Sequence, residues 1–142
     1  LNLPVPPGVA GSSPAWVANG PVAQSVERRY ISVLFNQKDI LFLGDTGAES
    51  SEKLIRNQGE NLKADIVQVA HHGQAGATEE LYKIIKSEIC LWPTTQRIWE
   101  NNMYGTEDDG PWTTKETRKW MENLNVKVNY LAFNGIQNIK IF

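Results

Sequence analysis

The sequence predicts an α/β domain in which strands alternate with helices. From Tyr30 onward, short apolar runs of strand length alternate with amphipathic segments of helical period, which is typical of a layered α/β or αβ sandwich fold. The chain has 142 residues, and a domain of this size can bury roughly two-thirds of its unfolded surface, enough for a core without disulfides.

Composition excludes several classes of protein. Fourteen Lys and Arg stand against sixteen Asp and Glu, a net charge of −2, so the basic excess that supplies most nucleic-acid or anionic-membrane affinity is absent. No apolar run approaches the ~20 residues of a spanning helix. The single cysteine, Cys90, excludes an internal disulfide. With no targeting signal, this free cysteine favours the cytoplasm.

The first 29 residues differ from the rest. Positions 1 to 26 contain no charged residue, and five of the seven prolines lie there, which excludes an ordinary helix or central strand. The stretch resembles peptides obtained when a structural-RNA gene is mistakenly translated. The alternative is a flexible Pro-rich linker. We therefore expect two parts, a leader over 1–29 and a folded unit over 30–142.

The first half of the folded unit predicts a hairpin followed by a helix. Tyr30 to Phe35 and Asp39 to Leu43 have strand character, and the polar residues between them suit a tight turn. Ala48 to Leu62 has an apolar side and acidic residues near its start, as in a helix.

Two strands and a helix follow. Asp65 to Ala70 and Ile89 to Trp92 are apolar strands, and between them a helix runs from the N-cap Thr78 to about Lys86.

The last third predicts a loop, a helix and a hairpin. Gln96 to Gly110 has no usable period and is expected to be a long loop. Thr113 to Glu116 forms a capping-box pattern that opens a helix, which Asn125 closes. Val126 to Phe133 and Ile136 to Phe142 flank Asn134-Gly135, which predicts a closing β-hairpin.

Two clusters carry groups suited to chemistry. Gly44-Asp45-Thr46-Gly47 and His71-His72-Gly73 each follow a predicted strand, where a layered α/β fold presents groups to ligands and glycine lets the backbone turn. A carboxylate and an imidazole from neighbouring strands would form half of a site for a divalent metal such as Zn²⁺. The plainer interpretations are a turn-forming Asp45 and a histidine pair in a surface loop.

The runs around these motifs resemble the C-terminal half of metallo-β-lactamase-fold hydrolases, nearest the ComEC-like branch. The resemblance rests on Ile40 to Asp45, on Ala64 to Gln74 and on Leu91 to Thr94. That branch carries Gly-Asp after a strand, then a helix, then an apolar strand ending in His-His-Gly. The resemblance implies the second half of an αββα sandwich.

It also implies a metal site and a reaction. In that family the Asp bridges two divalent ions, usually Zn²⁺ with Mn²⁺ as an alternative, and a His of the second motif holds one of them. Asp45 would be the bridging ligand. A ligand His directly before Gly is common in related members, which favours His72 as the second ligand, with His71 as the alternative; the other histidine would orient a ligand or contact substrate. The reaction implied is metal-dependent hydrolysis of a phosphodiester or related ester in a small-molecule or phosphodiester substrate.

The chain also departs from the family. Its members carry a His-x-His-x-Asp-His motif and a further upstream His, whereas no histidine precedes His71 here. At most Asp45, His71 and His72 remain, and catalytic zinc usually needs three protein ligands for each ion. We therefore expect a truncated half-domain that is inactive alone and binds little or no metal. An uncovered sheet face would favour self-association.

Two other functions compete with this one. Asp45-Thr46-Gly47 also resembles the catalytic loop of retroviral-type aspartic proteases, in which two chains each supply one Asp. The second is a non-catalytic structural or interaction fragment. Trp99 and Trp112 are candidate substrate contacts, with core packing as the alternative.

Overall fold

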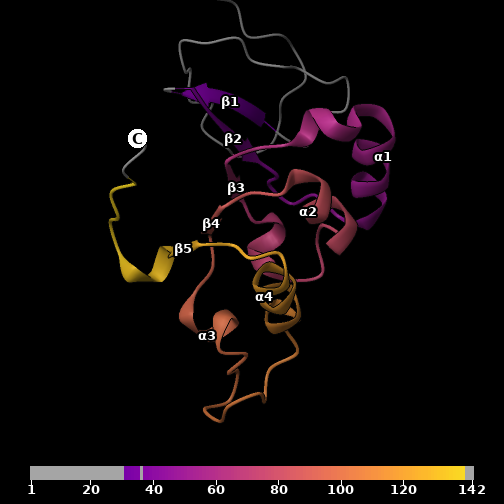
Figure 1. The fold of residues 1–142 in the computed structure, drawn as a ribbon. Helices are drawn as coiled ribbons and strands as arrows, with labels where there is room; N and C mark the ends of the chain where they lie inside the picture. Colours follow the sequence, from indigo (N-terminus) through magenta and orange to yellow (C-terminus); the bar gives the residue numbers. More distant parts are fainter. Residues whose placement is uncertain (1–30, 36, 140–142) are drawn as a thin grey trace, which may run out of the picture.

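The fold is a mixed α/β arrangement of one five-stranded sheet and four helices. The structure is a computed structural model that describes residues 31–35 and 37–139. The strands lie in the order β1-β2-β3-β4-β5, and the helices α1, α2 and α4 lie together on one side of them (Figure 1). The predicted leader, 1–29, lies outside the described residues. In the part of the chain that is described, no helix is long and apolar enough to cross a membrane.

The sheet begins with the predicted hairpin and continues as a parallel sheet. β1 (Ile31–Phe35) pairs antiparallel with β2 (Lys38–Phe42), so the first hairpin is confirmed. β3 (Ile66–Gln68), β4 (Ile89–Trp92) and β5 (Val128–Leu131) then add in parallel. Parallel neighbours need a crossover, and here each crossover contains a helix.

The helices follow the predicted order with two differences in detail. They are α1 (Ala48–Gln58), α2 (Glu79–Ile85), α3 (Gln96–Trp99) and α4 (Thr114–Asn123), with short 3₁₀ segments η1 (Gly59–Leu62), η2 (Ala70–Gly73) and η3 (Ala132–Asn134). The helix predicted to reach Leu62 changes at Gly59, whose φ is +50°. The segment predicted as loop begins with α3, because the side chain of Thr95 accepts from the backbone N–H of Ile98.

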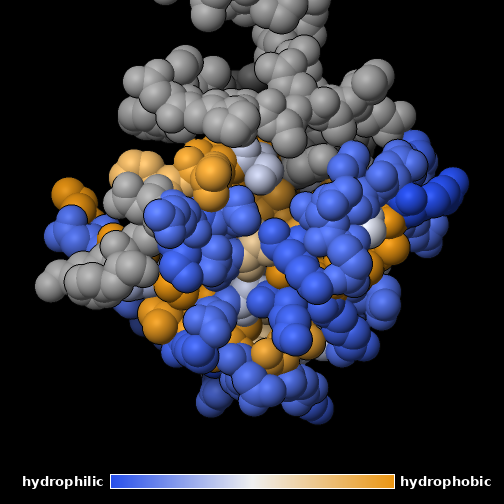
Figure 2. Space-filling view, turned by 45° about the horizontal axis from the view of Figure 1, so that its top comes forward, coloured by the Kyte–Doolittle hydropathy of each residue, from blue (hydrophilic) through white to orange (hydrophobic). Residues whose placement is uncertain are grey.

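The core lies between the sheet and these helices. Right-handed crossovers between neighbouring parallel strands place their helices on the same face. The buried residues of this layer come from alternate positions of the strands and from the inner faces of the helices; they include Leu41, Leu43, Val67, Val69, Leu81, Ile85, Cys90, Trp92 and Met121. Hydrophilic residues cover most of the surface in Figure 2.

Helix ends confirm some of the predicted signals. The side chain of Thr78 accepts from the N–H of Leu81 and caps α2. At the end of α4, Asn125 has φ +58°, its N–H donates to Glu122 O, and the N–H of Val126 donates to Met121 O. These two bonds form a Schellman motif.

The capping box at α4 was predicted wrongly. Thr113 is the N-cap, but its side chain makes no capping hydrogen bond. The backbone carbonyl of Thr113 instead accepts from the N–H of Glu116. The φ and ψ of Thr113, −92° and 11°, differ from the extended conformation usual at an N-cap.

The closing hairpin was also predicted wrongly. After β5 the chain enters η3, and residues 136–139 form no strand. The rest of the predicted second strand, 140–142, lies outside the described residues. Gly135 has φ +80° and ψ −155°, whereas a type I′ turn needs both angles in the left-handed helical region. Ile136 is 99% exposed, so no packing compensates for the cost of ordering a sixth strand.

The opposite face of the sheet is apolar as well. Alternation places ten apolar or aromatic residues and the polar Lys38 and Gln68 on it; the ten are Ile31, Val33, Phe35, Ile40, Phe42, Ile66, Ile89, Leu91, Val128 and Tyr130. Ile66, in the middle, is 1% exposed, whereas Phe35 and Val128, near the two margins, are 54% and 39% exposed.

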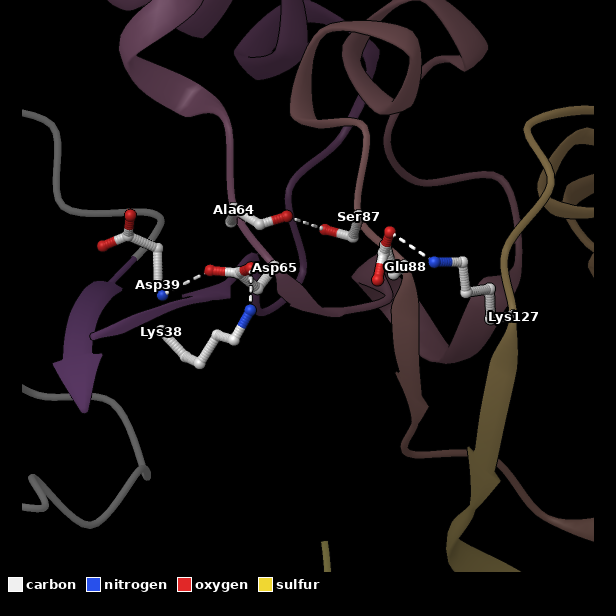
Figure 3. A network of polar contacts seen from close by, with 7 residues as sticks. All are labelled: Lys38, Asp39, Ala64, Asp65, Ser87, Glu88 and Lys127. Atoms are coloured by element: carbon white, nitrogen blue, oxygen red, sulfur yellow. Dashed lines mark hydrogen bonds and ion pairs between the residues drawn. The ribbon is translucent and has the colours of Figure 1, made fainter. Parts of the chain in front are cut away.

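A polar network joins the starting ends of the strands (Figure 3). The carboxylate of Asp65 accepts from Lys38 Nζ at 2.8 Å and from the N–H of Asp39 at 3.0 Å. The hydrogen bond from Lys38 is the main reason that the pKa of Asp65 lies below its usual value. Lys127 and Glu88 form a second ion pair, 2.6 Å between Nζ and Oε1. This edge is opposite to the one where the Gly-Asp and His-His-Gly motifs lie.

Candidate functional site

Three loops meet at the carboxyl edge of the parallel strands. They follow β2 (residues 44–47), β3 (residues 70–74) and β4 (residues 93–95). This edge is where open α/β sheets generally bind ligands. Both predicted motifs lie there, which agrees with their positions after strands in the sequence.

Gly44 links the first two loops. It has φ +55°, a conformation that favours glycine. Its carbonyl accepts from the N–H of His71 at 2.9 Å, and its N–H donates to Gln68 Oε1 at 2.8 Å. The structure therefore holds the Asp45 loop against the histidine loop through the backbone, although these motifs are 26 residues apart in the sequence.

The histidine loop has an uncommon backbone. His71, His72 and Gly73 have φ values of +48°, +61° and +79°. Left-handed conformations at non-glycine residues cost of the order of 1 kcal/mol each or more and tend to occur at functional sites. A Cβ added at Gly73 would lie 2.5 Å from the Trp92 ring, so this position also requires glycine for space.

His72 presents one ring nitrogen for coordination. Its Nδ1 lies 2.5 Å from the backbone carbonyl of Pro93. A carbonyl can only accept, so Nδ1 carries a proton, and in the corresponding tautomer the lone pair is on Nε2. Metal-binding histidines are commonly oriented in this way, by a carbonyl that accepts from the other nitrogen. This geometry favours His72 over His71 as the ligand.

Asp45 and the two histidines are all exposed at this edge. The rings of His71 and His72 have centroids 6.0 Å apart and are tilted by 43°. Among residues 31–35 and 37–139, no group of three or more His, Cys, Asp or Glu side chains is placed to hold a metal ion. Asp45 and the histidines carry oxygen and nitrogen donors of the kinds that Zn²⁺ accepts, and these described side chains do not by themselves form a complete metal site.

Gly76 packs into the same junction. A Cβ at this position would lie 2.9 Å from His71 Cβ and 3.1 Å from the carbonyl oxygen of Thr46. The two motif loops and the segment before α2 are thus in close contact. Thr46 itself is fully buried, and its hydroxyl donates to Leu43 O at 2.6 Å.

Trp99, a candidate substrate contact, packs against neighbouring side chains of the protein. Its ring makes an edge contact with Trp92 at 5.1 Å, and the guanidinium of Arg118 lies 4.0 Å from the ring centroid. Trp112 is half-buried, and its backbone N–H donates to Asn101 Oδ1. These contacts favour the packing role for Trp99.

The loop after α3 is organised around one carboxylate. Asp109 accepts from the N–H groups of Met103, Tyr104 and Thr106 and from the Thr106 hydroxyl. Desolvation acts to raise the pKa of Asp109, but these hydrogen bonds outweigh it and lower the pKa. Asp109 is therefore a structural residue of the loop.

A hollow of about 760 Å³ lies between α3 and α4. Its wall carries three basic and three acidic side chains and includes neither Asp45 nor His72. Because the charges balance, the hollow shows no preference for an anionic or a cationic ligand, and it is a weaker candidate site than the strand-end loops.

The sequence pattern did not identify two residues that shape the site. Gln68 and Gly76 hold the loops together, yet neither carries a reactive group. Gln68 did leave a signal, since it is the one polar residue in the apolar run from Ile66 to Ala70.

Comparisons of this chain with protein-family models and with curated proteins find no match.

Proposed function

We propose that residues 30–142 are the second half of a metallo-β-lactamase-type hydrolase domain, in which Asp45 and His72 form one flank of a divalent-metal site. The observation that carries the proposal is the junction of the two motif loops. Gly44 O accepts from His71 N, and Pro93 O fixes His72 with Nε2 available. The sheet with helices on one face and apolar residues on the other is consistent with half of an αββα sandwich.

Each residue has a defined task in this proposal. When bound, a pair of divalent ions supplies a hydroxide nucleophile near neutral pH and stabilises charge on the scissile group. Asp45 would offer carboxylate oxygens to both ions, and His72 would offer Nε2 to one of them. The phosphodiester or related ester would bind at this carboxyl edge of the sheet. His71 would contact substrate or orient a ligand.

The described residues do not complete the site, so we expect no turnover by this chain alone. The test measures hydrolysis of bis-p-nitrophenyl phosphate with Zn²⁺ or Mn²⁺ added, and equilibrium dialysis of the same ions. We expect weak metal binding, as suits an incomplete site, that Asp45→Ala and His72→Ala weaken further by at least about tenfold, with no turnover. Turnover that survives both substitutions would contradict the assignment of these residues.

A non-catalytic role is the second candidate. It is favoured by one observation, the absence of a group of three metal-binding side chains among the described residues. No metal binding by the wild-type chain would support it. The aspartic-protease alternative receives less support, because Asp45-Thr46-Gly47 leads directly into α1 and the sheet is mostly parallel, whereas those proteases are all-β. Peptidase activity of the wild-type chain that is lost in Asp45→Asn would support this alternative.

We also propose that two copies associate through the apolar sheet face. Apart from Lys38, which is paired with Asp65, its side chains are uncharged, so a second copy meets no unmatched charge there. The strand spacing gives a face roughly 24 Å wide and at most about 16 Å long, or about 380 Å² in projection, and Ile66 in its middle is already buried. This is below the roughly 800 Å² per partner of a standard stable interface, so we expect the association to be weak.

A matched pair of variants in β1 tests the association. Phe35 lies on the apolar face and Leu34 on the opposite one, and their exposed fractions are similar, 54% and 46%. We expect Phe35→Lys to shift the chain toward the monomer in sedimentation equilibrium and Leu34→Lys to leave the association unchanged. Equal behaviour of the two variants would contradict this interface, as would a monomeric wild-type chain.

A further inference from the structure

Gln68 connects the end of β3 to the Asp45 loop. The register between β2 and β3 ends with the pair Phe42 and Gln68, so Gly44 lies beyond the backbone ladder. At this point the Gln68 side chain supplies the acceptor that a strand carbonyl would otherwise supply, because its Oε1 accepts from Gly44 N at 2.8 Å. A side chain of β3 thus replaces the next hydrogen bond of the sheet.

The orientation of the Gln68 amide is determined by its partners. Gly44 N–H can only donate and Val69 O can only accept, so Oε1 faces Gly44 and Nε2 donates to Val69 O. Both ends of the amide are therefore in use. Gln68 itself is half-buried, whereas Gly44 is exposed.

Gly44 is consequently held on both sides. Its N–H belongs to the peptide group before it and its carbonyl to the peptide group after it; Gln68 holds the first and His71 N holds the second. The two bonds together fix φ and ψ of a glycine, the residue with the greatest freedom at a turn. The position of Asp45, the next residue, depends directly on these angles.

We propose that Gln68 is a positioning residue that sets the location of Asp45 relative to His72. The inference rests on the proposed function, since its consequence is the geometry of the metal flank. Gln68 is not itself a ligand in this proposal, because both polar atoms of its amide are bonded to the backbone.

The test compares Gln68→Met with Gln58→Met. Methionine is close in size to glutamine but neither donates nor accepts strongly, and Gln58 is a half-buried residue at the end of α1, away from the site. We expect amide exchange of Gly44 and His71 to accelerate about tenfold in Gln68→Met and to stay unchanged in Gln58→Met. We also expect Zn²⁺ affinity to fall about tenfold in Gln68→Met alone, with a similar melting temperature.

The outcomes separate the two proposals. If the wild-type chain binds no Zn²⁺, the proposed function fails, and exchange at Gly44 still decides whether Gln68 holds the loop. Unchanged exchange at Gly44 in Gln68→Met would overturn the proposal, as would faster exchange with unchanged Zn²⁺ affinity. Should Gln68→Met fail to fold, exchange in the wild-type chain decides. A Gly44 N–H that exchanges there as fast as in an unstructured peptide would overturn the proposal, because Gln68 would then not hold it.

Discussion

Gly76→Ala should disrupt the junction of the two motif loops. The new Cβ would lie 2.9 Å from His71 Cβ, 3.1 Å from Thr46 O and 3.4 Å from Ala70 Cβ. Unstrained carbon–carbon contacts are about 3.5–4.0 Å, so at least two loops must move by several tenths of an ångström. Such overpacking typically costs about 1–3 kcal/mol. At this chain length, that corresponds to roughly 3–4 °C in melting temperature for each kcal/mol.

The matched control is Gly47→Ala, where an added Cβ meets no atom within 4 Å. Gly47 is the N-cap of α1, and alanine there should cost less than about 1 kcal/mol. Thermal unfolding followed by circular dichroism, together with Zn²⁺ titration, measures both effects. We expect Gly76→Ala to lose both stability and metal affinity. Wild-type values for both quantities in Gly76→Ala would refute the close packing of these loops.

Three further predictions follow from the described contacts. Thr78→Ala should lower the free energy of unfolding by about 1 kcal/mol, because it removes the side-chain cap of α2. Thr113→Ala should lower it by less than about 0.5 kcal/mol, because the Thr113 side chain makes no capping bond. Equal losses for the two variants in urea titrations would contradict this. The lowered pKa of Asp65 implies stability that is present above the unfolded pKa of about 4 and is lost as the pH falls through the folded value. Asp65→Asn should flatten this loss, by less than about 1 kcal/mol, because the pair with Lys38 is partly exposed; an unchanged pH profile would argue against the pair. Burial raises the pKa of Cys90 to about 12, so its thiol should be inert to a disulfide reagent at pH 8 until the chain is unfolded in urea; fast native labelling would show that Cys90 is accessible.

Local signals predicted most of the fold. The first hairpin, the cap of α2 and the left-handed Asn125 depend on nearby residues, and the structure confirms all three. The closing hairpin failed because its turn signal needs a second strand that can bury a face. Phe133 instead lies near Trp99, with ring centroids 6.3 Å apart, and the chain turns into η3.

The candidate site could be predicted only in part. The strand ends placed Asp45 and His72 at one edge, because parallel strands end together. The contacts that join the loops depend on long-range packing: Gln68 with Gly44, and Gly76 between Thr46 and His71. No spacing in the sequence reports such contacts. The resemblance favours His72 from its place before glycine, and the bond to the Pro93 carbonyl, which comes from a third strand end, adds a second argument for it.

A double-mutant cycle on Zn²⁺ affinity tests the central claim most directly. Isothermal titration of the wild-type chain, Asp45→Ala, His72→Ala and the double variant measures whether the two residues bind the same ion. We predict that each single variant loses at least about tenfold in affinity and that the double variant falls no more than about threefold further, because ligands of one ion are strongly coupled. A wild-type chain that binds Zn²⁺ no more tightly than the double variant would contradict the account.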